Sequence, residues 1–251
     1  MPLFHLSTRD AARKPHPGDA TWFLPFTDTS SQYETVSVVS IGFNNPIKTI
    51  NANKNDQISF TITRDASTYT TTATIPEGNY TGSSLATAIT ELMYAATSSA
   101  HNSWVSYATN FAQLYVQPEV GHTRTITFHS ISNDAYTQMG VVVETTYASP
   151  DEYFTYPVNL HYTDFLDFIG DNFASSDQFN SAGTRSIVAR IPLENAYATY
   201  LLYEPKFATP ITFNANRFMS MTIRVIDQFG EEVVFPQNWP ITYTFNLTFT
   251  E

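Results

Sequence analysis

The sequence has no cysteine, few glycines and little charge of either sign. Without cysteine the chain can form neither a disulfide framework nor a thiolate metal site. With only nine glycines it contains no glycine-rich phosphate loop. Its 12 Lys and Arg face 23 Asp and Glu, which gives a net charge of −11. Binding to nucleic acid depends on Lys and Arg contacts to phosphates, so we expect no direct nucleic-acid contact from the body of the protein.

Long hydrophobic runs are also missing. No apolar run approaches the ~18 residues that a membrane-spanning helix needs. The N-terminus lacks the apolar segment of a secretory signal. We therefore expect no membrane span and no secretion by that route.

The residues that are abundant favour β-strands. Phe, Tyr and Trp make up 15% of the chain, and threonine is frequent in the segments that look extended. Apolar and polar residues alternate in 57–63, 218–226 and 241–249, which is typical of strands with one buried face. We predict that the last two runs form a closing hairpin through Asp227–Gly230. The other predicted strands are 36–43, 68–75, 104–107, 111–117, 124–129, 141–146, 186–191, 198–203 and 211–213.

Two segments have helical spacing instead. Apolar residues follow one helical face from Leu85 to Ala96, with Ser83 or Ser84 available as the N-cap. A second, shorter helix is predicted over Thr163–Gly170, which has a capping residue, two turns of apolar spacing and a terminal glycine.

About ten short strands separated by turns predict an all-β fold, because a parallel sheet would need alternating strands and long helices. We predict a single jelly-roll β-sandwich over residues 33–251, with one or two short helices. Residues 1–32 are predicted to form an extended N-terminal arm, because their prolines exclude a regular element. Residues 1–18 carry a net charge of +2, ahead of an acidic domain.

The residues suggest three possible kinds of chemistry. His122 and His129 bracket one predicted strand, and His161 precedes Asp164 by three residues. A two-histidine-plus-carboxylate metal site is one interpretation, but we favour solvated loop histidines and predict no metal and no cofactor. The acidic residues of one region suggest a calcium site or a glycosidase carboxylate pair, but their spacing matches no EF-hand, and helix capping explains the first of them. They are Asp164, Asp167, Asp171 and Asp177.

Several segments in order resemble one family of viral proteins. These are 36–43, 44–56, the Ile75–Tyr80 signature (IPEGNY) that enters the first helix, and 223–230. Together they resemble the penton, or minor capsid, proteins of virophages and polinton-like viruses, which are related to the adenovirus penton base. The resemblance implies a single jelly roll of which five copies form the capsomer at an icosahedral five-fold vertex. It also implies a virion location and a double-jelly-roll major capsid protein as partner, with further minor capsid or spike proteins around it. The chain has no Arg-Gly-Asp tripeptide and little room for a large insertion, so receptor binding is not implied.

The leading hypothesis is therefore a structural capsid protein that assembles into a ring and is not an enzyme. Five residues of the arm are predicted to contact the inner face of an adjacent capsomer: Phe4, Leu6, Arg9, Arg13 and Lys14. Deleting residues 1–20 is expected to leave a folded domain that incorporates poorly.

Two alternatives stay open. A virion spike or lectin-like module would stack loop aromatics on a glycan, with Tyr147, Tyr153 and Tyr156 as candidates. A β-sandwich glycoside hydrolase is the other, although no acid and nucleophile pair can be named for it.

Overall fold

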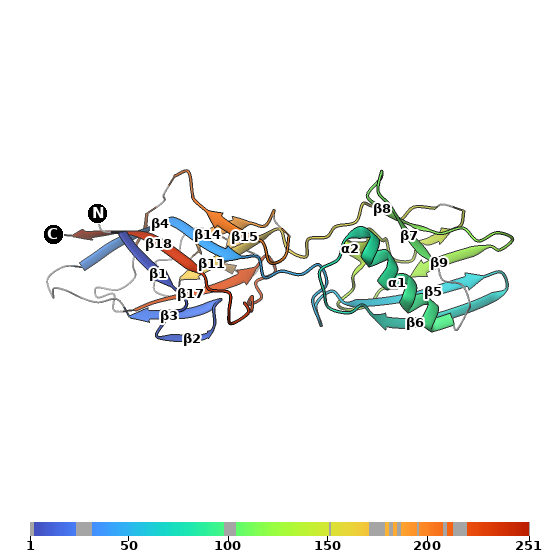
Figure 1. The fold of residues 1–251 in the computed structure, drawn as a ribbon, viewed down its shortest axis with the longest axis horizontal. Coiled ribbons are helices and arrows are strands. Elements are labelled where there is room, and N and C mark those ends of the chain that lie inside the picture. The colour runs from blue at the N-terminus through green and yellow to red at the C-terminus, as the bar shows by residue number, and fades with distance from the viewer. Residues whose placement is uncertain are drawn as a thin grey trace. The chain divides into compact units, whose positions relative to one another are not determined.

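The structure, a computed structural model, consists mainly of β-strands (Figure 1). It describes residues 3–23, 32–97, 104–150, 152–170, 179–180, 183–184, 187–194, 196–207, 210–212 and 220–250. The chain divides into two compact units, which are taken one at a time below. The jelly-roll unit comprises Met1–Pro46 and Thr163–Glu251, and the inserted unit comprises Ile47–Tyr162.

Two sheets make up the jelly-roll unit. The first has the order β1, β18, β4, β15, with β16 also paired to β4, and the second has the order β14, β11, β17, β3, β2. The strands of the first sheet are β1 (Leu3–Ser7), β4 (Gln32–Asn44), β15 (Tyr200–Tyr203), β16 (Ile211–Thr212) and β18 (Thr242–Thr250). Those of the second are β2 (Arg13–His16), β3 (Asp19–Phe23), β11 (Phe165–Gly170), β14 (Ile187–Pro192) and β17 (Ser220–Asp227). A separate pair is formed by β12 (Phe179–Asn180) and β13 (Gly183–Thr184).

Eight of these strands are connected as a jelly roll. In chain order β1, β3, β4, β11, β14, β15, β17 and β18 are strands one to eight. One sheet then has the order one, eight, three, six, and the other has the order two, seven, four, five. The predicted fold class, an all-β jelly-roll sandwich, is confirmed.

Aromatic side chains fill the space between the two sheets. The ring of Phe43 on β4 lies 5.4 Å from that of Phe168 on β11 and 6.0 Å from that of Phe235. Tyr243 on β18 lies 5.5 Å from Trp22 on β3 in an edge-to-face arrangement. All five residues are buried, and each aromatic pair of this kind contributes about 0.5–1.5 kcal/mol beyond the area it buries.

The predicted N-terminal arm is largely part of this sandwich. Residues 3–23 form β1, β2 and β3, and β1 pairs with β18 along its whole length. The prediction that no regular element runs through this segment is therefore wrong for the described residues; residues 1–2 and 24–31 lie outside them. Prolines are tolerated here because Pro15 is on β2, at the edge of its sheet, and Pro17 lies in the turn into β3.

Three further predictions need correction. Residues 165–170 form strand β11 instead of a helix, because the segment is buried on both faces and a short apolar run has no helix-specific period. β17 and β18 lie in different sheets, so they form no hairpin. The Asp227–Gly230 turn instead returns residues 231–233 alongside the end of β17, where the Val233 N–H donates to the Val225 carbonyl. The inserted unit lies between β4 and β11 in the chain. Residues 33–251 therefore contain an inserted unit, where one domain with little room for an insertion was predicted.

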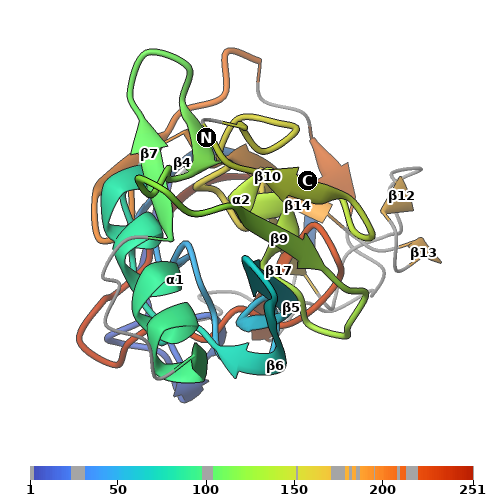
Figure 2. The same ribbon diagram turned by 90° about the vertical axis from the view of Figure 1, so that its right-hand side faces the viewer.

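The inserted unit is a four-stranded sheet covered on one face. Its order is β10, β9, β5, β6, and Figure 2 shows helix α1 beside strands β5, β6 and β9. Leu85, Ile89 and Met93 of α1 share one buried core with Phe60 and Phe128 of the sheet. The elements are β5 (Gln57–Arg64), β6 (Ser67–Thr74), α1 (Gly82–Thr97), β7 (Val105–Ala108), β8 (Gln113–Val116), β9 (Arg124–Phe128), α2 (Tyr136–Met139) and β10 (Thr146–Ala148).

The helix predicted from Leu85 to Ala96 is confirmed as α1, with a different cap. Thr81 Oγ1 accepts the Ser84 backbone N–H at 3.2 Å, and Ser84 Oγ accepts the Thr81 N–H at 2.9 Å. Thr81 is therefore the N-cap, and Ser84 completes a reciprocal capping pair. In the described part of the chain, no helix has the length and apolar character to span a membrane.

Candidate functional site

Two of the five predicted contact residues face the sandwich. Phe4 and Leu6 are half-buried on β1, opposite Phe245 and Tyr243 of β18. Between them His5 is exposed, and its Nδ1 lies 3.1 Å from Thr244 Oγ1. The alternation places Phe4 and Leu6 against the core, so they support the fold.

The three cations of the same segment are exposed. Lys14 Nζ donates to the backbone carbonyl of Arg9 at 3.0 Å, which brings these two residues together. Arg9, Arg13 and Lys14 form no ion pair with any described side chain, and Asp10 beside them is exposed too. They leave a net positive surface over β2 and the turn before it.

A second exposed surface lies on β15, at the opposite edge of the first sheet. Tyr200 and Leu202 are 58% and 53% exposed, and Phe207, just beyond the strand, is 87% exposed. Gly42 faces Leu202 in the register, and a Cβ there would come within 2.2 Å of the Tyr200 hydroxyl. Glycine at this position thus lets the Tyr200 side chain lie across β4. This surface was not predicted from the sequence, although four apolar residues in a row, 200–203, exceed what one face of a strand can bury.

The acidic residues singled out from the sequence do not form a site. Asp167 is fully buried on β11, and Arg190 of β14 donates to its two carboxylate oxygens at 2.7 and 2.8 Å. This hydrogen bonding raises the pKa of Arg190. Asp164 is exposed, and Asp171 and Asp177 lie outside the described residues. Asp167 is therefore a structural residue that joins two strands.

The histidines are also apart from one another. His122 Nδ1 lies 2.6 Å from Asp65 Oδ2, and this contact lowers the pKa of Asp65. His161 is exposed. Within the part of the chain that the structure describes, no three His, Cys, Asp or Glu side chains are grouped so as to hold a metal ion.

One hydrogen-bonded chain resembles a catalytic triad in its residue types. His129 Nε2 lies 2.7 Å from Thr61 Oγ1, and His129 Nδ1 lies 3.3 Å from a carboxylate oxygen of Glu144. Thr61 Oγ1 is shared with Thr70 Oγ1 at 2.8 Å, and the Glu144 side chain is 63% exposed. Glu144 holds His129 only loosely, so His129 is poorly oriented as a base for activating Thr61. We therefore assign these hydrogen bonds to the packing of the sheet surface.

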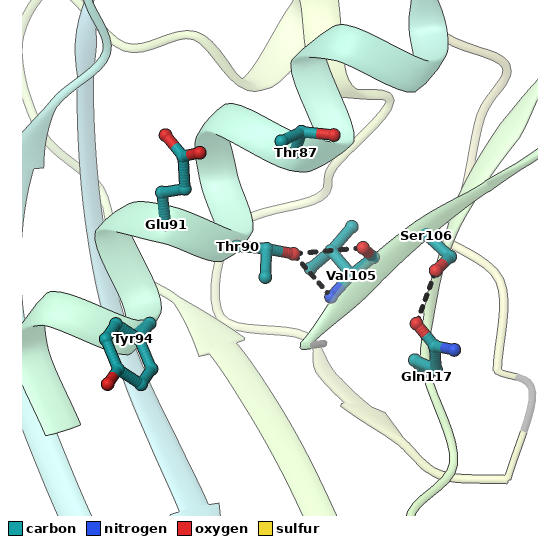
Figure 3. Close-up of a pocket in the computed structure, with 7 residues that line it drawn as sticks. All are labelled: Thr87, Thr90, Glu91, Tyr94, Val105, Ser106 and Gln117. Atoms are coloured by element: carbon teal, nitrogen blue, oxygen red, sulfur yellow. Dashed lines mark hydrogen bonds between the residues drawn. The ribbon is translucent and has the colours of Figure 1, made fainter. Parts of the chain in front are cut away.

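A pocket of about 360 Å³ opens between α1 and the β7–β8 hairpin (Figure 3). Thr90 Oγ1 donates to the Val105 carbonyl at 3.0 Å and accepts the Val105 N–H at 3.1 Å. Ser106 Oγ donates to Gln117 Oε1 at 2.5 Å. These bonds fix one wall, and Glu91 and Tyr94 project from α1. The lining residues are Thr87, Thr90, Glu91, Tyr94, Val105, Ser106 and Gln117.

The aromatic residues proposed for glycan stacking are not in this pocket. Tyr147 is buried, with its hydroxyl 2.7 Å from Thr155 Oγ1. Tyr153 packs edge-to-face on Phe111, and Tyr156 is exposed. The pocket was not predicted because Glu91 and Tyr94 fall on the polar face of the predicted helix. Their three-residue spacing, which places both side chains on the same side of the helix, was the available signal.

The whole fold is similar to that of a solved capsid protein. The crystal structure of a selenomethionine-labelled mavirus penton protein matches with a TM-score of 0.61 and 9% sequence identity, covering 99% of this chain and 99% of that one. No family model and no curated protein matches the sequence. The two chains thus have a common fold over nearly their full length.

Proposed function

We propose that the chain is a penton-type minor capsid protein, five copies of which form the capsomer at the icosahedral vertices of a virion. The observation that carries this proposal is the fold similarity to the mavirus penton protein over 99% of both chains. The similarity includes both units. A likeness confined to the jelly roll, which is a widespread fold, would not account for a match that also includes the inserted unit.

The exposed surfaces of the jelly-roll unit support self-assembly. A ring of identical subunits needs two different, complementary surfaces on each copy. Aromatic residues are enriched at such interfaces, and Tyr200 and Phe207 are largely exposed. The mechanism is therefore assembly, and we propose no catalytic activity, cofactor or metal.

The proposed partners are further copies of the chain, the double-jelly-roll major capsid protein, and other minor capsid or spike proteins. Because Phe4 and Leu6 face the sandwich, the neighbour-binding role is narrowed to Arg9, Arg13 and Lys14. Their exposed charges are suited to an acidic neighbour.

Electron microscopy of the purified full-length protein tests the proposal. We expect ring-shaped particles whose class averages have five-fold symmetry. Co-expression with the double-jelly-roll protein of the same genome should then place these rings at the vertices of shells. Particles that stay single subunits under the same conditions would contradict the proposal.

A second candidate function is glycan binding, and the pocket beside α1 is the observation in its favour. Its wall combines an aromatic ring (Tyr94), a carboxylate (Glu91) and hydroxyl and amide groups, which suit a neutral sugar. Saturation-transfer NMR with a set of neutral monosaccharides tests it. A signal lost in Tyr94→Ala and kept in Tyr156→Ala would support this function, and no signal for the unmodified protein would rule it out.

A further inference from the structure

The two flanks of the jelly-roll unit are different surfaces, and each contains two edge strands, one from each sheet. The β15 flank consists of β14, β15 and residues up to Phe207. The β1 flank consists of β1, β2 and the residues between them. β1 and β15 are the two edges of the first sheet, and β2 and β14 are the two edges of the second. We propose that the ring closes through the β15 flank of one copy docking on the β1 flank of the next copy.

This inference rests on the proposed capsid function and adds to it the pair of surfaces that meet. In the described sheets, each of these four strands has one neighbouring strand. An edge strand presents backbone groups that can pair with another chain, and proteins ordinarily protect such edges with charges or coverings. On β15 the exposed side chains are Tyr200 and Leu202, so the edge is apolar.

The apolar side chains of the two flanks are matched in kind. Leu3 on β1 is 56% exposed, and Phe23, at the end of β3 next to this flank, is 74% exposed. These face solvent in one subunit, as Leu202 and Phe207 do on the β15 flank. Large exposed apolar residues grouped at an edge mark a contact surface, whereas scattered ones need no explanation.

The exposed charges of the two flanks are opposite. On the β1 flank Arg9, Arg13 and Lys14 outnumber Asp10. On the β15 flank Glu194 and Glu204 outnumber Lys206, and these two acids form no ion pair with a described side chain. Arg190, also on this flank, is already bound to Asp167.

Complementary charge decides which surfaces meet. Two β1 flanks would place like charges together, and so would two β15 flanks, whereas one of each brings opposite charges together. A contact between unlike surfaces continues from copy to copy and closes into a ring when the rotation per step allows it. The second copy of this chain is therefore the occupant of each flank.

Crosslinking tests the pairing. Because the chain has no cysteine, a maleimide reagent reacts only with the cysteines that are introduced. Leu3→Cys and Leu202→Cys are introduced into the same full-length chain, which is treated with a short bis-maleimide. We expect a ladder of linked species up to the ring size. A mixture of the two single variants should give dimers only. Each single variant treated alone is the matched control and should give no linked species.

Charge exchange gives an independent readout. Two double variants are compared, Arg13→Glu, Lys14→Glu and Glu194→Lys, Glu204→Lys. Each should raise the protein concentration needed for ring formation at least tenfold. The four substitutions combined in one chain should restore it. Circular dichroism confirms that each variant is folded.

The outcomes separate the inference from the function on which it rests. Rings in the unmodified protein, with no Leu3–Leu202 ladder and no restoration by the four-fold exchange, overturn the pairing and leave the capsid function standing. A monomeric unmodified protein overturns the capsid function, and the pairing with it.

Discussion

The open sheet face of the inserted unit and the β15 edge of the jelly-roll unit are both exposed, but they carry different kinds of side chain. Both belong to a chain with little charge, yet one surface carries hydroxyls and the other carries apolar side chains. On the inserted unit, Thr61 and Thr70 are bonded at 2.8 Å across β5 and β6, and Thr127 and Thr146 at 2.8 Å across β9 and β10. The residues of this face are Ser59, Thr61, Thr63, Thr68, Thr70, Thr72, Thr125, Thr127 and Thr146.

This difference indicates that the sheet face of the inserted unit is suited to exposure to water and that the β15 edge is suited to contact with another protein. Threonine hydroxyls paired across strands satisfy one another and still accept water, so the inserted sheet is stable when exposed. The hydrocarbon surfaces of Tyr200 and Leu202 form no hydrogen bonds with water, and covering them with a neighbouring protein lowers the free energy.

Deleting residues 1–20 should have the largest effect, and it should fall on the jelly-roll unit. The deletion removes β1, β2 and the start of β3, which uncovers Tyr243 and Phe245 in the core. Hydrogen exchange should show lost protection in β17 and β18, with β5 and β9 still protected by their own core. Arg13→Glu, Lys14→Glu is the control and should keep both units protected. Retained protection in β18 after the deletion would restore the idea of a dispensable arm.

Arg190→Leu should destabilise the jelly-roll unit by about 1–3 kcal/mol, because the buried Asp167 carboxylate loses two hydrogen bonds from the guanidinium. Arg64→Leu in the inserted unit should cost less, since Glu119 keeps its bond to Arg124. Urea unfolding of both variants measures the difference. Equal losses would show that burial of the carboxylate does not control the cost.

Acid should weaken the inserted unit through Glu119. The hydrogen bond from Arg64, reinforced by Arg124, lowers the pKa of Glu119 from 4.5 to about 2. A carboxylate with a lowered folded-state pKa stabilises the fold above its unfolded pKa, and this contribution is lost as pH falls from about 4.5 to about 2. Thermal melting between these pH values should show a steeper decline for the unmodified protein than for Glu119→Gln. Parallel declines would exclude Glu119 as a cause.

The smallest effects are expected from two buried tyrosines. The Tyr243 hydroxyl is buried and has no hydrogen-bond partner among the described atoms, and burial raises its pKa. Tyr243→Phe should therefore change stability by less than about 1 kcal/mol, or increase it. The Tyr147 hydroxyl accepts the Val142 N–H at 3.0 Å and contacts Thr155, so Tyr147→Phe should cost about 1–2 kcal/mol. Calorimetry of the two variants compares them, and a larger loss for Tyr243→Phe would reverse the assignment.

Local patterns in the sequence predicted the elements better than their connections. Alternation in 57–63 and the apolar face of Leu85–Ala96 predicted β5 and α1, because each pattern has a single period. The segment 165–170 was mistaken for a helix because Asp167 is buried with Arg190, a partner 23 residues away that local spacing does not show.

The roles of the termini and of the inserted unit depend on long-range pairing. β1 is a strand because β18, at the other end of the chain, provides its hydrogen bonds. No local signal marks Ile47–Tyr162 as a separate unit, because the division of the chain depends on pairing between strands that are far apart in the sequence. For the candidate site, the cations Arg9, Arg13 and Lys14 were predicted from the sequence, whereas the position of the apolar residues 200–203 at a sheet edge follows only from the sheet order.

Native mass spectrometry of the full-length protein tests self-assembly most directly. We predict a dominant species at five times the 28.2 kDa chain mass, which dissociates as salt rises and screens the charges between flanks. A dominant 28.2 kDa species at every concentration and salt level would contradict the account.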